Sequence, residues 1–261
     1  MADESVLIER KGPRTTVTLN RPAALNAIAL GLHRELARVF RELAEDEETA
    51  LVVLTGAGRA FSAGGDMTFL QELQANDRLI EEVVRHGRTI ILSLLELPQP
   101  VLAAVNGDAI GLGCSLALAC DCVIAVETAR FGDPHVRLGL VPGDGGALFW
   151  PALVGPARAK EYLFTGRLLP APEAAQLGLI NRAVPADALW PTVDALAEEI
   201  LANPPAAVRG AKRAVNRAVF GEAGVLLDLS LALEAQTLAS TAFREAVAAW
   251  LERRRPEFRG R

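Results

Sequence analysis

The feature that most constrains the fold is an apolar stretch, interrupted by glycines, at residues 98–122. A five-residue run, Val101–Val105, is followed by three glycines within seven residues, beginning at Gly107, and by a second run, Cys114–Ala119. These lengths predict a buried strand, a glycine turn and a buried helix. Such a turn aims unpaired backbone N–H groups at a ligand oxygen that gains negative charge. The glycines would equally let the helix pack closely on a sheet, and this stretch alone favours neither interpretation.

The composition of the 261-residue chain excludes several classes of protein. Hydrophobic residues make up 51% of it, which predicts a sizeable core in one large or two small domains. A net charge of −5 argues against a general nucleic-acid binder, which needs a basic surface. No apolar run reaches the roughly 18 residues that span a membrane, and the acidic N-terminus lacks a signal-peptide core. We therefore expect a cytoplasmic protein with no membrane or nucleic-acid partner.

The three cysteines, Cys114, Cys120 and Cys122, lie within nine residues of an apolar segment. An odd number in such a segment indicates buried thiols in a reducing compartment and not a disulfide framework. No second cluster of cysteine or histidine accompanies them, so we expect no zinc site.

Short apolar or β-branched segments alternate with helical patterns up to about residue 185, and the remainder is helical. The alternation predicts an α/β fold of stacked ββα turns, covered by a separate helical layer. Histidines 33 and 86 are expected on the polar sides of their helices. The predicted strands are 6–9, 15–19, 51–54, 101–105, 123–125 and 179–184, and the predicted helices are 30–44, 80–97, 114–119, 148–153, 157–163, 172–177, 187–202, 205–219, 223–239 and 241–253.

Five motifs in order resemble the crotonase superfamily, the enoyl-CoA hydratase/isomerase family, over nearly the whole chain. Each is weak alone, but together and at this spacing they are specific. They are Asn20-Arg21-Pro22 with Leu25-Asn26-Ala27, Phe61-Ser62-Ala63-Gly64-Gly65-Asp66, Val105-Asn106-Gly107, Gly111-Leu112-Gly113-Cys114, and Phe131-Gly132 through Pro142-Gly143 with Gly145-Gly146.

The resemblance implies a spiral of ββα units over residues 1–200 and a C-terminal helical trimerisation region over residues 201–261. It implies a homotrimer or a dimer of trimers. The expected activity is that of a lyase or isomerase on an acyl-CoA thioester, as in fatty acid metabolism. No metal and no redox cofactor are implied, because coenzyme A enters as part of the substrate.

The resemblance also implies where the substrate lies. Backbone N–H groups of Gly65 and Leu112 would form an oxyanion hole for a thioester enolate, which is worth about 10²–10³ in rate per donor. Asp66 is also expected to cap the helix that follows it. Arg59 and Arg259 are candidates near the CoA phosphates, or else solvated surface residues. The residues expected along the CoA and acyl path are Ala23, Ala24, Leu25, Ala63, Gly64, Asp66, Met67 and Arg59.

The chain departs from the family at the two glutamates that hydratases use to activate water. Ser115 and His135 stand at those positions. His135 is suited to proton transfer near neutral pH, and Asp144 is a second candidate base or a partner that orients His135. Ser115 is expected to be a small packing residue, and Asp108 to have no catalytic role.

Two hypotheses follow from this departure. The first is an acyl-CoA-transforming enzyme whose enolate is held by Gly65 and Leu112, with His135 and Asp144 as proton carriers. The second is a catalytically silent acyl-CoA-binding or assembly protein. A standard crotonyl-CoA hydratase ranks below an unusual specificity, because serine and histidine cannot rebuild a two-glutamate water site without a changed mechanism. The acyl group is not specified by the sequence.

Overall fold

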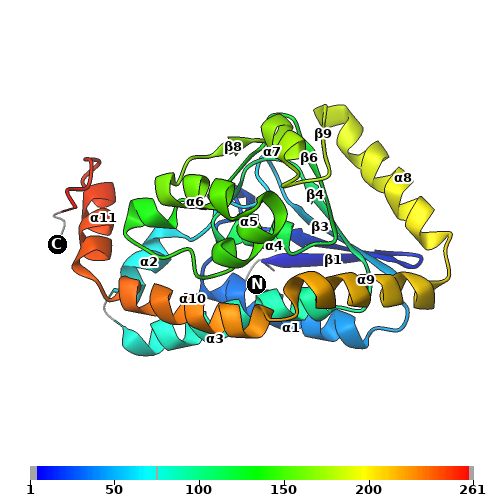
Figure 1. Cartoon of the computed structure of the whole chain (residues 1–261), viewed down its shortest axis with the longest axis horizontal. Coiled ribbons are helices and arrows are strands. Elements are labelled where there is room, and N and C mark those ends of the chain that lie inside the picture. The colour runs from blue at the N-terminus through cyan, green and yellow to red at the C-terminus, as the bar shows by residue number, and fades with distance from the viewer. Residues whose placement is uncertain (1–4, 75, 259–261) are drawn as a thin grey trace.

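The computed structural model describes residues 5–74 and 76–258 and has two sheets (Figure 1). The six-stranded sheet has the order β1-β2-β3-β4-β6-β9; β1 and β2 are antiparallel, and the remaining neighbours are parallel. The three-stranded sheet has the order β5-β7-β8. The strands are β1 (Val6–Lys11), β2 (Arg14–Leu19), β3 (Leu51–Gly56), β4 (Val101–Val105), β5 (Ala109–Ile110), β6 (Cys122–Val126), β7 (Arg130–Gly132), β8 (Leu169–Pro170) and β9 (Arg182–Val184).

Helices lie between these strands and follow them, and α9, α10 and α11 come last in the chain (Figure 1). Within the described ranges, no helix is long and apolar enough to cross a membrane. The helices are α1 (Leu30–Glu45), α2 (Met67–Leu73), α3 (Asp77–Glu96), α4 (Leu112–Leu118), α5 (Gly146–Val154), α6 (Pro156–Thr165), α7 (Ala171–Leu177), α8 (Leu189–Leu201), α9 (Pro205–Phe220), α10 (Ala223–Leu238) and α11 (Thr241–Leu251), with the short 3-10 helices η1 (Pro22–Ala24), η2 (His135–Leu138) and η3 (Ala186–Ala188).

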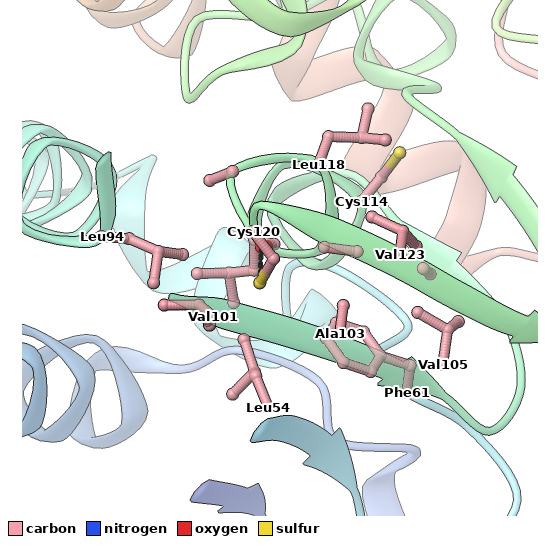
Figure 2. Packing of buried hydrophobic residues seen from close by; sticks show 14 of the residues in the cluster. Leu54, Phe61, Leu94, Val101, Ala103, Val105, Cys114, Leu118, Cys120 and Val123 are labelled. Carbon is pink, nitrogen blue, oxygen red and sulfur yellow. Dashed lines mark hydrogen bonds between the residues drawn. The ribbon is translucent and has the colours of Figure 1, made fainter. Parts of the chain in front are cut away.

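The core is centred on β4, which is buried along its whole length. Every residue of β3 and of α4 is buried as well. Figure 2 shows Leu54 of β3 pointing toward β4, and Cys114 of α4 on the far side of β6 from β4; these residues and Val123 of β6 belong to one core cluster. A strand that is buried on both faces has a continuous apolar sequence. For this reason the strand within residues 98–122 could be predicted from the sequence.

The predicted architecture is confirmed for the hairpin, the parallel strands and the buried helix after Gly111. Strands β5, β7 and β8 were not predicted, and the bounds of several predicted elements were wrong, two of which matter here. The strand predicted at 179–184 is paired only over Arg182–Val184, and the helix predicted from Ile80 begins at Asp77. Its cap is the side chain of Asn76, which accepts from Leu79 N at 3.2 Å, a local hydrogen bond that hydrophobic spacing does not reveal.

The sequence pattern had indicated that the C-terminal helices form a separate layer, and for α10 this prediction was wrong. Helix α10 runs beside α3 (Figure 1), and its Leu227 and Leu231 belong to the main core cluster. It also contacts α5, whose preceding loop carries Asp144. The tail of the chain therefore takes part in building the interior, and this has consequences for the site.

Candidate functional site

One large cavity of about 810 Å³ collects most of the residues that the sequence singled out. Gly65, Leu112, His135 and Asp144 all line it. The remainder of the lining is largely apolar and comes from α2, α3, η2, α10 and α11. A cavity of this size with a few convergent polar groups is typical of a small-molecule site.

On one wall of the cavity, Gly65 presents a backbone N–H with no acceptor among the described residues. Its neighbours are fixed, because Ile28 N donates to Gly64 O at 2.7 Å and Asp66 N donates to Ile28 O at 3.1 Å. Gly64 has φ +85°, and a Cβ there would lie 2.8 Å from Ile110 O, so glycine is required. The N–H of Gly65 is therefore held in place and left free for a ligand.

The second free donor is Leu112, the first residue of α4, whose N–H has no acceptor among the residues described. Gly111 precedes it with φ +54°, and its own N–H donates to Gly132 O at 2.9 Å. Gly113 lies so close to the neighbouring loop that a Cβ would be 2.5 Å from Ser62 Cβ. The close-packing interpretation of these glycines thus holds, and the interpretation as a donor to a ligand oxygen stays a prediction, made on an amide with no acceptor among the described residues.

His135 lies on another wall of the cavity, at the start of η2, with 13% of its side chain exposed. Its Nδ1 makes a short hydrogen bond with Asp133 Oδ1, which also accepts from His135 N at 3.4 Å. Asp133 is 2% exposed and its other oxygen has no partner among the described residues. The imidazole is therefore oriented by a buried carboxylate on the side away from Nε2.

Two further carboxyl groups face Nε2 of His135. Asp144 Oδ2 lies 3.5 Å from it, and Glu234 Oε1, from α10, lies 3.6 Å from it. Burial lowers the pKa of His135, but the charges of Asp133 and Asp144 and their hydrogen bonds outweigh burial and raise it well above 6.5. Burial raises the pKa of Glu234 to about 8, with a further increase from Asp144 and a decrease from His135. The pKa of the His135 imidazole and the pKa of the Glu234 carboxyl are therefore both raised in this site.

Glu234 is a site residue that the sequence analysis missed. It belongs to the stripe Leu227, Leu231, Glu234 and Leu238, which follows helical spacing and is buried in the structure. A glutamate on an otherwise apolar stripe is uncommon without a buried partner, and this was the available signal. Its partner, His135, lies 99 positions away in the chain, and only the packing of α10 brings the two together.

Ser115 and Asp108 behave as predicted. Ser115 is 2% exposed on α4, with Oγ 3.5 Å from Asp144 Oδ1, and a Cβ on Gly145 would lie 2.8 Å from it, so it is a small packing residue. Asp108 forms a surface ion pair with Arg130 and does not line the cavity.

The prediction for His33 was wrong. It is buried, lines the cavity and has an Nδ1 with no partner among the described residues. Burial lowers its pKa to about 4, against a smaller opposing effect of Asp144. The helical pattern missed this because α1 packs against both the sheet side and α3, so its buried face is wider than its apolar residues indicate. His86 is partly exposed, as expected.

Some of the residues expected along the CoA and acyl path line the cavity, and others lie outside it. Asp66 also caps α2 as predicted, accepting from Thr68 N at 3.1 Å and Phe69 N at 3.5 Å. Ala23 and Arg59 are exposed and lie outside the cavity lining, and Arg259 lies outside the described residues. The predicted path residues that do line the cavity are Ala24, Leu25, Ala63, Gly64, Asp66 and Met67.

Three side chains of the site, those of Asp133, His135 and Asp144, have possible ligand atoms within 4.8 Å of one another. This spacing is compatible with a metal site. The two carboxylates, however, approach opposite nitrogens of one imidazole. Because the ring nitrogens point in different directions, one ion cannot replace both contacts. The geometry favours proton transfer along the imidazole.

Comparison with known proteins places this geometry in context. Residues 11–261 match the sequence model of a family described as enoyl-CoA hydratase/isomerase. The chain is 36% identical to a short-chain-enoyl-CoA hydratase of Clostridium acetobutylicum, with 97% of each chain covered. It is 42% identical to an enoyl-CoA hydratase/isomerase of Mycobacterium paratuberculosis, whose crystal structure gives a TM-score of 0.89 over 94% of this chain and 98% of that one. A monofunctional enoyl-CoA isomerase of M. smegmatis is 34% identical, with a TM-score of 0.71 over 83% of this chain and 94% of that one.

Proposed function

Because the chain belongs to the enoyl-CoA hydratase/isomerase family, with the crotonase fold, we propose that it transforms acyl-CoA thioesters through an enolate. The N–H groups of Gly65 and Leu112 hold the thioester oxygen, and His135 and Asp144 act as proton carriers. The observation that carries the proposal is the cavity itself, in which two free backbone donors face the same space as an imidazole with carboxylates on both sides.

The reaction is proton transfer next to a thioester, in the form of hydration or double-bond isomerisation. Removing a proton beside the thioester, or adding water to a conjugated alkene, places negative charge on the thioester oxygen. Preorganised donors stabilise that charge by about 3–4 kcal/mol each when they are buried. Hydration by the usual two-glutamate route is excluded, because Ser115 and His135 occupy those positions. Water must therefore be activated by the carboxyls around His135.

The alternative is a catalytically silent acyl-CoA-binding or assembly protein on the same fold. The missing glutamates favour it, whereas the raised pKa of the His135 imidazole favours an enzyme, because perturbed titratable groups concentrate at catalytic sites. Neither a metal nor a redox cofactor is required by the proposed chemistry.

The test compares turnover of crotonyl-CoA and of a panel of longer enoyl-CoA thioesters by wild type, His135→Ala and Asp144→Asn. Each substitution is expected to lower kcat by about 10²–10⁴, as for loss of a positioned acid or base. Asp108→Asn is the matched control, since it neutralises a half-buried aspartate outside the cavity. Binding of the whole panel without turnover would support the silent protein, and full turnover by both variants would refute the assigned roles.

The oxyanion hole has its own test in Leu112→Pro. Proline is tolerated at the first position of a helix and removes the N–H that would face the thioester. We expect kcat to fall by about 10²–10³. Leu112→Ala, which keeps the N–H, controls for the lost side chain, and equal activity of the two variants would contradict the assignment.

We also propose that the chain assembles as a homotrimer or a dimer of trimers through its last helices. Large apolar side chains are exposed along α9 and α10, including Val215, Val225 and Leu229, which are 60%, 71% and 59% exposed. Light scattering during size-exclusion chromatography gives the mass, and a monomer at micromolar concentration would contradict this proposal.

A further inference from the structure

The structure places two carboxyl groups beside one imidazole nitrogen in a site that lacks both of the family's glutamates. Asp144 and Glu234 approach His135 Nε2 from different elements, the loop before α5 and helix α10. We propose that these two residues are the acid–base pair of the reaction, and that Glu234 is the group that exchanges a proton with the α-carbon of the acyl thioester. This inference rests on the proposed function, because it requires an enolate.

The surroundings of Glu234 are built to admit its side chain. Gly143 lies directly under it, and a Cβ at that position would be 2.5 Å from Glu234 Oε2 and 2.6 Å from its Cβ. Two hydrogen bonds join the same loop to α10: Ser230 Oγ donates to Gly143 O at 2.8 Å, and Val141 N donates to Thr237 Oγ1 at 3.1 Å. Glycine at 143 and these two bonds fix the carboxyl at the cavity.

The carboxyl of Glu234 is available to a substrate. It lines the cavity, the residue is only 9% exposed, and it makes no hydrogen bond to any described residue. The charged groups that face it are Asp133, His135 and Asp144, and the wall on its own helix is apolar. Burial raises the pKa of Glu234 to about 8, which favours the protonated acid, and its carboxyl makes no hydrogen bond to the described residues.

For addition of water to an enoyl thioester, every proton and electron pair can be assigned to one of these residues or to the substrate. Asp144 takes a proton from water while the water oxygen bonds to the β-carbon, and the alkene electron pair moves to the thioester as an enolate. The O–H bond of Glu234 then breaks, and the enolate pair forms the new C–H bond at the α-carbon. His135 passes its Nε2 proton to Glu234 and receives the proton held by Asp144, which restores the site.

The experiment separates Glu234 from Asp144 by measuring two reactions. One is hydration of crotonyl-CoA; the other is exchange of the α-protons of butyryl-CoA in D₂O, followed by NMR, which needs no water addition. Glu234→Gln is expected to lower both by about 100-fold or more, with a smaller effect on KM. Asp144→Asn is expected to lower hydration by a similar factor and to leave α-exchange within about tenfold of wild type.

Asp228→Asn is the matched control, because it makes the same change on the same helix at an exposed carboxylate paired with Arg88. It is expected to leave both rates unchanged. If Glu234→Gln keeps α-exchange within about threefold of an active wild type, the inference is wrong while the proposed function stands. If wild type binds these thioesters but neither hydrates nor exchanges them, the proposed function fails and the inference fails with it.

A pH profile of the wild-type protein tests the same role of Glu234, and the result does not depend on whether a variant folds. Exchange requires Glu234 as the ionised base, so its rate should rise as the pH rises through about 8, whereas hydration requires the protonated acid and should fall over the same range. A merely structural glutamate would not give opposite slopes, and parallel profiles would overturn the assignment.

Discussion

The pKa values of two histidines that line the same cavity, the buried His33 and the partly buried His135, shift in opposite directions. Burial lowers the pKa of His33 to about 4, and the charges of Asp133 and Asp144 overcome burial to raise the pKa of His135 well above 6.5. His33 lies 6.3 Å from the Phe69 ring, between centroids, and its Nδ1 has no partner among the described residues. The comparison teaches that partners, more than burial, decide which titratable group is fitted for proton transfer.

The largest expected effect is on turnover. His135→Gln removes the imidazole between the carboxyls and should lower kcat by about 10²–10⁴. His33→Leu should lower it by less than about tenfold, because a neutral wall residue can only affect the fit of the acyl chain. Steady-state kinetics on one enoyl-CoA substrate give both values. Equal losses in the two variants would remove the functional distinction between these histidines.

The next effect is on stability, through Asp133→Asn. Removing one member of a buried charge pair costs about 3–5 kcal/mol, so the midpoint of urea unfolding should fall well below that of wild type. The raised pKa of His135 makes this contribution complete below pH 6.5 and lost as the pH rises through its folded-state pKa. The gap between variant and wild type should therefore narrow at alkaline pH.

Asp108→Asn is the control for that measurement, because its pair with Arg130 is exposed and exposed pairs contribute about 0–1 kcal/mol. An Asp133→Asn variant no less stable than Asp108→Asn would mean that His135 is not charged in the folded protein.

His33 should show the opposite pH dependence. The unfolded chain takes up a proton at this residue near pH 6.5, whereas the folded chain resists it until about pH 4. Wild type should therefore lose about 3 kcal/mol of stability as the pH falls between these values, and His33→Leu should lose that much less. Parallel stability curves for the two proteins would show that His33 finds a partner when it is protonated.

The smallest effect is expected from Ser115→Ala, which tests whether closeness to Asp144 is enough to give a role. The hydroxyl lies 3.5 Å from Asp144 Oδ1, so its loss should change stability by less than about 1 kcal/mol and turnover by only a few-fold. Ser115→Glu should instead lose several kcal/mol, because it forces a larger side chain and a second carboxylate into a fully packed position. Thermal unfolding of the two Ser115 variants measures these stability changes. A Ser115→Glu protein as stable as wild type would contradict the prediction.

The two walls of the site differed in how far the sequence predicted them. Gly65 and Leu112 were named as candidate donors from the resemblance to the family, and the structure adds that the neighbouring glycines fix the local backbone, such as Gly64 at φ +85°. His135 and Asp144 were predictable as candidates because they share one loop. Glu234 was not, since its role depends on a contact between α10 and a loop about 90 residues earlier. His33 was predicted on the polar side of its helix, and this was wrong because its burial also depends on contacts between α1 and elements distant in the chain.

The sequence by itself determined the strands of the large sheet and the buried helix, because those follow from short-range apolar periodicity, and its resemblance to the family indicated the candidate backbone donors. It also determined that the usual pair of glutamates is absent. Only the tertiary structure shows which carboxyl groups lie at the site, because packing of α10 against the loop before α5 brings Glu234 and Asp144 to one nitrogen of His135. Charge interactions fall off with distance through space and take no account of separation along the chain, so a site built from them becomes visible only when the chain is folded.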